Sequence, residues 1–186
     1  SRSLYMDGNA TIIAANKLLA AMRKEDGTLR TYDEMKAEGI ETKYLGRYET
    51  NTTPGLCRLD PNTGIGDPTP AFTYCLNLAE VEVDTKTGKT TVLKFTCVDF
   101  VGRIGNIDAV NGQAYSGIMH GIGFALKEDY ADVKKHANMF GAGTSYIKDV
   151  PDDINLIHID GAISDGPFGS SGASEAFQAS GHCAVL

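Results

Sequence analysis

The sequence predicts an α+β fold in which a β-hairpin, as part of a mixed sheet, packs with helices. Between Phe72 and Phe100, apolar and polar residues alternate on both sides of a polar, glycine-containing link at residues 84–89, and this pattern indicates a hairpin. Apolar residues recur at helical spacing in residues 9–23 and again in residues 112–126. Because strands and helices occupy separate stretches, an α+β arrangement is favoured over a doubly wound α/β sheet.

The part of the chain before the hairpin is expected to hold two helices and a loop. The first helix covers residues 9–23. A second, short helix is expected over Thr31–Glu38, because Thr31 is followed three residues later by Glu34, the spacing of a capping box. Residues 50–70 are rich in Pro, Gly, Asn, Thr and Asp, which is typical of irregular loops.

The helix expected over residues 112–126 contains three glycines, Gly117, Gly121 and Gly123. Glycine lowers helix propensity, so its presence here indicates close packing against another backbone or against a cofactor. A short strand is expected over Ile154–Ile159.

Length and composition limit the classes of protein. With 186 residues, of which 42% are hydrophobic, we expect a single domain over residues 1–186. The formal net charge of -7 argues against nucleic acid as a partner, and no apolar stretch is long enough to span a membrane. No metal site made of protein side chains is expected, since neither the cysteines nor the histidines show a ligand spacing. We expect reduced, buried thiols, structural histidines and a cytoplasmic location; the residues are Cys57, Cys75, Cys97 and Cys183, with His120, His136, His158 and His182.

A glycine-rich loop, residues 165–175, ends in a single carboxylate, Glu175, and runs into an apolar, helix-like segment, residues 176–186. Glycines let main-chain N–H groups approach a bound anion or cofactor, and a helix start adds a positive dipole end. A carboxylate in a partly dry pocket is suited to accept a proton near neutral pH. The alternative is a plain helix start, with Glu175 in its first turn.

Several segments, in this order and spacing, resemble the molybdenum hydroxylases. They are the opening Ser1-Arg2-Ser3, residues 98–103 (VDFVGR), residues 112–126 (GQAYSGIMHGIGFAL) and the loop that ends in Glu175. The likeness covers nearly the whole chain and is to the C-terminal part of the molybdopterin-binding subunit in the xanthine oxidase and aldehyde oxidoreductase family. Residues 128–148 and the DGPFG segment look most similar to the bacterial aldehyde oxidoreductases.

This resemblance implies a role for each of the matching residues. Glu175 would be the general base, taking the proton of a hydroxyl held by molybdenum while its oxygen attacks the substrate carbon. Gln113 would hydrogen-bond the molybdenum cofactor through its side-chain amide, which offers both a donor and an acceptor. Without the family, Gln113 is an ordinary residue near a helix start. The other expected cofactor contacts are Ser1, Arg2, Ser3, Gly172, Ala173 and Ser174.

The resemblance also implies cofactors and partners. The expected cofactor is molybdenum–molybdopterin, as such or as its cytosine dinucleotide, and 2Fe-2S clusters are expected elsewhere in a longer parent. We expect oxidation of a small-molecule aldehyde to a carboxylic acid with water as the oxygen source. The expected partners are the remainder of the molybdenum subunit and iron–sulfur domains, in a homodimer or hetero-oligomer. The chain alone is expected to be inactive.

Three alternatives stay open from the sequence, and two residues depart from the family pattern. The alternatives are a purine or heteroaromatic hydroxylase of the same family, a non-catalytic phosphate- or nucleotide-binding module that uses Gly166 to Gly172, and a purely structural or assembly domain. Against the phosphate-binding alternative, the loop lacks the Gly-Lys-Ser/Thr ending of a P-loop. The departures are His120, where the family usually has glutamine, and Ser174, where it usually has glycine.

Overall fold

The computed structural model describes residues 3–49, 59–66, 69, 71–162, 164, 166–173, 176–177 and 184–185. By its internal contacts the chain separates into two compact units, residues 2–70 and residues 71–186 with Ser1. The expectation that residues 1–186 form one domain stays a prediction. Within the described residues, no helix combines the length and the hydrophobicity needed to cross a bilayer.

The described part of the unit of residues 2–70 contains two helices, α1 (Ser3–Met22) and α2 (Tyr32–Ala37). The predicted capping box of α2 is confirmed, because the Thr31 side chain accepts from the Glu34 N–H while the Glu34 carboxylate accepts from the Thr31 N–H. Helix α1 begins six residues before the predicted start at residue 9. Leu4 and Met6 are good helix formers, so the helix extends further toward the N-terminus than the apolar spacing indicated.

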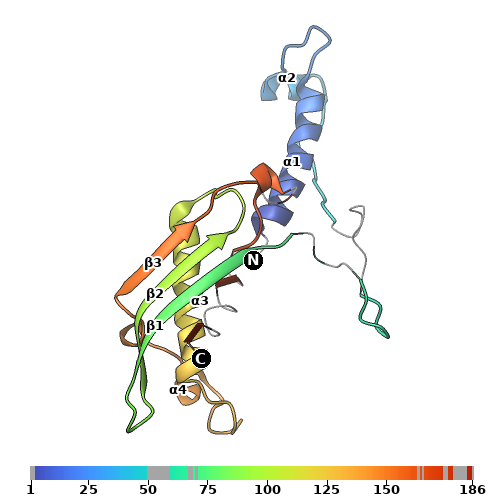
Figure 1. Cartoon of the computed structure of the whole chain (residues 1–186). Helices are drawn as coiled ribbons and strands as arrows, with labels where there is room; N and C mark the ends of the chain where they lie inside the picture. The colour runs from blue at the N-terminus through green and yellow to red at the C-terminus, as the bar shows by residue number, and fades with distance from the viewer. Residues whose placement is uncertain are drawn as a thin grey trace. The chain divides into compact units, whose positions relative to one another are not determined.

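An extended segment, residues 41–49, runs along α1 (Figure 1). Lys17 Nζ donates to the Leu45 carbonyl at 2.9 Å, and the hydroxyls of Tyr5 and Tyr48 lie 3.1 Å apart. Gly46 approaches the α1 backbone so closely that a Cβ there would overlap the Ala10 carbonyl. Contacts at three levels of α1 therefore hold this segment in place.

The second unit contains a three-stranded mixed sheet in the order β1-β2-β3 (Figure 1). Strands β1 (Tyr74–Val83) and β2 (Thr90–Phe100) form the predicted antiparallel hairpin, with a register shift between Glu80 and Val81. Strand β3 (Asp153–His158) pairs in parallel with β2, so the short C-terminal strand is also confirmed. The α+β fold class, with its hairpin in a mixed sheet, is thereby confirmed.

One face of the sheet packs against α3 (Ile107–Leu126). Helix α3 begins five residues before the predicted start at residue 112, because the Asn106 side chain caps it by accepting from the Ala109 N–H at 3.0 Å. An apolar cluster of buried residues forms the core of the second unit, with contributions from β2, the residue that follows it, α3 and the C-terminal segment: Val92, Phe95, Cys97, Val101, Ala114, Ile118, Ile122, Phe177 and Val185.

The α3 glycines are buried, and close packing is seen at Gly123, where the neighbours are side chains rather than the backbone or cofactor that the sequence suggested. Gly117, Gly121 and Gly123 are all buried. A Cβ at Gly123 would lie 2.6 Å from the Ser145 hydroxyl oxygen. This part of α3 thus packs against the segment between α4 (Met139–Ala142) and the 3-10 turn η2 (Ile147–Asp149).

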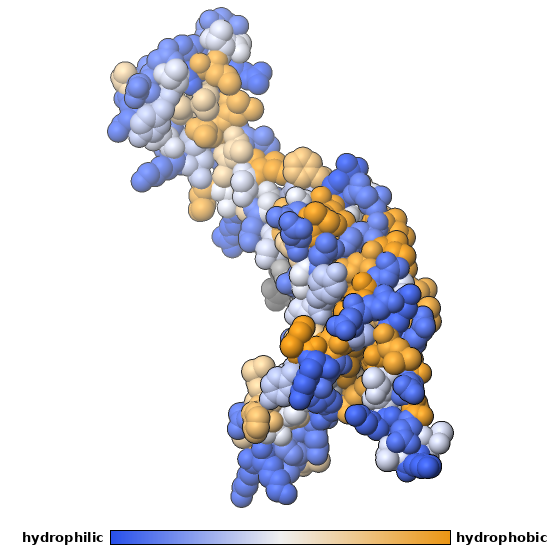
Figure 2. All heavy atoms as spheres, turned by 90° about the vertical axis from the view of Figure 1, so that its left-hand side faces the viewer, coloured by the Kyte–Doolittle hydropathy of each residue, from blue (hydrophilic) through white to orange (hydrophobic). Residues whose placement is uncertain are grey.

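The opposite face of the sheet is exposed and largely apolar, and we call it the open sheet face. Strand pairing aligns Tyr74 with Phe100, and Leu76 with Val98 and then Ile157, so these side chains share one face. On β1 the exposed fractions are 62% for Tyr74, 64% for Leu76 and 59% for Leu78. Figure 2 shows apolar surface, in orange, gathered over the part of the molecule that holds the sheet. The apolar residues of the open sheet face are Tyr74, Leu76, Leu78, Val98, Phe100 and Ile157, of which Val98 and Phe100 are half-buried; Thr96 and Asn155 lie on the same face.

Candidate functional site

The glycine-rich loop lies against the residues that follow β2. Gly102 and Ser170 form an antiparallel bridge, and the Ser171 N–H donates to the Val101 carbonyl at 3.0 Å. The Ser171 hydroxyl also donates to the Phe72 carbonyl, at 3.0 Å, just before β1 begins. The loop is therefore fixed at the edge where β2 ends and β1 starts.

The loop has a tight internal shape, built around the short turn η3 (Pro167–Gly169). Phe168 and Gly169 have positive φ angles of 58° and 79°. At Gly169 a Cβ would overlap Ala162, so both the backbone angle and the space require glycine there. The Ser164 hydroxyl closes the loop by donating to the Ser170 carbonyl and accepting from the Gly166 N–H.

Gly172 and Ala173, two of the predicted cofactor contacts, continue from this fixed loop. Both are half-buried, and within the described part of the chain their backbone groups make no hydrogen bond. Ala173 packs against the apolar cluster to which Phe177 belongs. Polar backbone groups that are partly shielded from water and have no partner are suited to an external ligand. The residues present therefore fit a bound polar cofactor at this loop.

Gln113, the other predicted contact, lies in the second turn of α3 with its side chain exposed. The next residue, Ala114, is fully buried in the same apolar cluster as Phe177. The structure therefore brings together the helix that carries Gln113 and the segment that follows the loop, since both pack into one core.

The remaining predicted site residues divide into two groups. Ser3 is the first residue of α1 and belongs to the other compact unit, so its role as a cofactor contact stays a prediction. Four further predicted residues lie outside the described residues, namely Ser1, Arg2, Ser174 and the proposed base Glu175.

A buried polar bridge, which the sequence patterns did not reveal, lies beside these elements. His158 Nδ1 is 2.5 Å from Asp99 Oδ2, and His158 Nε2 is 2.7 Å from Asn111 Oδ1. Burial raises the pKa of Asp99, and the hydrogen bond to His158 opposes this shift. The sequence does contain one signal: Asp99 is in phase with Phe95 and Cys97 along β2, which places a carboxylate on the core face, where it needs a partner.

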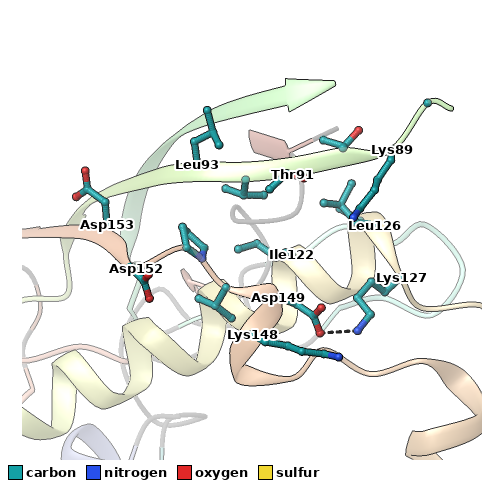
Figure 3. A pocket seen from close by; sticks show the side chains of 16 residues that line it. Lys89, Thr91, Leu93, Ile122, Leu126, Lys127, Lys148, Asp149, Asp152 and Asp153 are labelled. Atoms are coloured by element: carbon teal, nitrogen blue, oxygen red, sulfur yellow. Dashed lines mark hydrogen bonds and ion pairs between the residues drawn. The ribbon is translucent and has the colours of Figure 1, made fainter. Parts of the chain in front are cut away.

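A separate pocket of about 790 Å³ lies between the start of β2, the end of α3 and residues 148–153. Figure 3 shows that Lys127 and Asp149 form an ion pair there, with Nζ and Oδ2 2.5 Å apart. No predicted site residue is among its described lining residues, and it adjoins the end of α3 remote from Gln113. Among the described residues, no group of three or more His, Cys, Asp or Glu side chains could hold a metal ion.

Comparison with known proteins defines the class to which this fold and this loop belong. The family model of the molybdopterin cofactor-binding domain matches residues 1–151. The chain therefore belongs to the molybdopterin cofactor-binding domain family of the molybdenum hydroxylases, as its sequence motifs indicated.

Individual relatives refine this assignment. The chain is 41% identical over 186 residues to an aldehyde oxidoreductase of Megalodesulfovibrio gigas, covering 100% of this chain and 20% of the relative. It is similar to the crystal structure of the aldehyde oxidoreductase from Desulfovibrio desulfuricans, with 43% identity and a TM-score of 0.90 over 99% of this chain and 20% of that one. Quinoline 2-oxidoreductase from Pseudomonas putida shows 32% identity and a TM-score of 0.51, over 57% of this chain and 14% of that chain. The chain thus spans about a fifth of the length of the aldehyde oxidoreductases that it matches.

Proposed function

We propose that this chain is part of a molybdopterin-dependent oxidoreductase that converts an aldehyde to a carboxylic acid with water as the oxygen source. Membership of the molybdopterin-binding family and the likeness to two aldehyde oxidoreductases support the proposal. One structural observation supports it most directly. After the fixed part of the loop, the backbone groups of Gly172 and Ala173 have no hydrogen-bond partner among the described residues.

The reaction converts an aldehyde and water into a carboxylic acid, two protons and two electrons. The molybdenum–pterin group, when bound, supplies the centre that takes up the two electrons. In our proposal Glu175, two residues after Ala173, removes a proton so that the oxygen derived from water can bond to the carbonyl carbon. A carboxylate that follows the fixed segment Gly169 to Ser171 closely in the sequence suits this task, because the base must stay within hydrogen-bond reach of the proton it accepts.

The cofactor contacts follow from the positions of the residues. Gln113 would direct its amide toward the cofactor, donating through its NH₂ group and accepting at its carbonyl oxygen. Gly172 and Ala173 would offer backbone groups from the loop. We further propose that Arg2 pairs with the phosphate of the cofactor, in either its pterin or its cytosine dinucleotide form. Ser1, Ser3 and Ser174 complete the proposed set of contacts.

The proposed partners are the remainder of a longer molybdenum subunit and domains that carry 2Fe-2S clusters, in a homodimer or hetero-oligomer located in the cytoplasm. The relatives are about five times as long as this chain, and the open sheet face leaves Tyr74, Leu76 and Leu78 uncovered. We propose that an apolar surface of the remaining polypeptide covers this face, since exposed patches of this kind mark contact surfaces. Without that remainder, the chain is expected to bind no cofactor stably and to show no activity.

The decisive experiment is the Glu175→Gln change in the full-length polypeptide that carries this chain. This substitution keeps the size of the side chain but removes the base. We expect molybdenum and pterin contents to stay at the parent level while turnover falls by about 10²- to 10⁴-fold. Glu82→Gln, on an exposed position of β1, is the matched control and should keep full turnover. Near-parental turnover of Glu175→Gln would show that another group is the base.

A heteroaromatic substrate is the second candidate, favoured by the 32% identity to quinoline 2-oxidoreductase. The chemistry differs only in the carbon that receives the oxygen, so the same loop could serve either substrate. A comparison of kcat/KM for aldehydes and for purines or quinolines with the same enzyme preparation separates the two. Preference for a ring carbon would replace the aldehyde assignment but leave the roles of Glu175 and Gln113 intact.

A further inference from the structure

We propose that His158 is a positioning residue: by joining the end of β2 to the N-terminal half of α3, it fixes Gln113 relative to the glycine-rich loop. The inference rests on the proposed function, in which Gln113 contacts the cofactor. His158 is the last residue of β3, and the bridge it forms consists of Asp99 on β2, His158 and Asn111 on α3.

The geometry determines how the protons are distributed along this bridge. Asn111 Oδ1 can only accept, so His158 Nε2, 2.7 Å away, must carry a proton and donate it. Between His158 Nδ1 and Asp99 Oδ2, 2.5 Å apart, two bare acceptors would repel each other. A proton therefore lies between them, and His158 is held by a hydrogen bond on each side of its ring.

Burial makes the bridge costly to break. The Asp99 side chain has no exposed surface, and that of His158 is 10% exposed. The second carboxylate oxygen, Asp99 Oδ1, has no hydrogen-bond partner among the described residues, so His158 is the side chain that satisfies this carboxylate. Removing His158 would leave a buried carboxylate without a partner, which is far less favourable than the intact bridge.

Each end of the bridge leads directly to one part of the proposed site. Beyond Asp99, β2 ends at Phe100, and the next two residues, Val101 and Gly102, bind the loop through their backbones at Ser171 and Ser170. At the other end, Asn111 lies two residues before Gln113 on the same helix. The His158 side chain therefore links β2, whose end leads into the residues that bind the loop, to α3, the helix that carries Gln113. It does so through two hydrogen bonds.

The test uses the full-length polypeptide that carries this chain. His158→Leu removes both hydrogen bonds, Asn111→Leu removes one, and Asn111→Asp keeps an acceptor for Nε2. His136→Leu is the matched control, because His136 also faces an aspartate, Asp129, at 3.7 Å but takes no part in the bridge. Hydrogen exchange is measured for peptides from residues 106–116 and from residues 117–126, together with molybdenum and pterin content.

We expect His158→Leu and Asn111→Leu to speed exchange in residues 106–116 by about tenfold or more, the equivalent of one lost hydrogen bond. Residues 117–126 should exchange as in the parent, and cofactor content should fall severalfold. Asn111→Asp and His136→Leu should behave like the parent. If His158→Leu does not fold, Asn111→Leu alone carries the test, since Asn111 is only half-buried.

Two results would overturn the inference: uniformly faster exchange along α3, which indicates a general stabilising role, or faster exchange in residues 106–116 with full cofactor content. Gln113→Ala separates this from a failure of the proposed function. If Gln113→Ala retains full cofactor content and turnover, the proposed role of Gln113 is wrong, whatever His158 does. If Gln113→Ala loses cofactor while His158→Leu does not, the positioning role alone is wrong.

Discussion

The sulfur atoms of Cys75 on β1 and Cys97 on β2 lie 3.4 Å apart on the core face of the sheet. Both cysteines are free thiols; Cys97 is completely buried, as expected from the sequence, whereas Cys75 is only half-buried. The other two cysteines, Cys57 and Cys183, lie outside the described residues. Cys97 therefore combines a thiol partner at hydrogen-bond distance with complete burial.

We predict that Cys97 is inert toward thiol reagents while the protein is folded. The hydrogen bond with Cys75, and then burial, raise the pKa of the Cys97 thiol, so the reactive thiolate does not form near neutral pH. Alkylation at pH 8 followed by peptide mass spectrometry should leave Cys97 unmodified, whereas the same treatment in denaturant should modify it fully. Modification of Cys97 at equal rates in both conditions would contradict the buried, hydrogen-bonded thiol.

A second prediction concerns the loop glycine Gly169. Its φ of 79° and the overlap of a Cβ with Ala162 mean that Gly169→Ala should destabilise the protein by about 2 kcal/mol or more. Gly112→Ala is the control: Gly112 lies within α3 with open space around its Cα, so alanine there should stabilise by about 1 kcal/mol. Denaturant unfolding of the two variants measures both effects. Equal effects of the same sign would contradict the loop geometry.

Local features of the sequence predicted much of this fold. The capping box of Thr31 and Glu34 and the hairpin of β1 and β2 depend on neighbouring residues, and both are confirmed. Hydrogen bonds between distant residues could not be predicted in this way: Asp99 and His158 are 59 positions apart, and their pairing depends on the parallel register of β2 and β3. The resemblance to the family pointed to Gln113 and the glycine-rich loop as cofactor contacts. The periodicity of the sequence alone did not assign a ligand to either of them.

A third prediction concerns the acid sensitivity of the α2 cap. The hydrogen bond from Lys24, together with those from Thr31, lowers the pKa of Glu34 from 4.5 to about 2. A carboxylate with a lowered folded-state pKa adds stability that is fully present above 4.5 and is lost as the pH falls through about 2. Glu34→Gln keeps a capping-box side chain but removes the charge that pairs with Lys24 at 2.7 Å.

The parent should therefore exceed Glu34→Gln in stability at pH 7, and the difference should vanish near pH 2. Thermal unfolding followed by circular dichroism at low ionic strength measures this, and added salt should shrink the difference because the pair is exposed to solvent. Thr31→Ala removes the side-chain cap itself and should cost about 1 kcal/mol at pH 7. A difference between parent and Glu34→Gln that persists at pH 2 would show that the charge is not its source.

The last prediction tests whether the rest of a longer polypeptide covers the open sheet face. Leu76 is 64% exposed in this chain, so a lysine there is tolerated unless another surface covers it. In the full-length polypeptide, Leu76→Lys would bury an unpaired charge, and we expect a loss of about 3 kcal/mol or more. Val133→Lys, at an exposed apolar residue of a turn away from the sheet, should change stability by less than about 0.5 kcal/mol.

Thermal unfolding and light scattering of the two full-length variants distinguish the possible occupants of the face. If the remaining polypeptide covers it, Leu76→Lys lowers the melting temperature and the cofactor content while the oligomeric state stays unchanged. If a second copy of the chain covers it instead, Leu76→Lys turns dimers into monomers that retain their molybdenum. Equal stability of Leu76→Lys and Val133→Lys would mean that the face is exposed to solvent in the full-length protein.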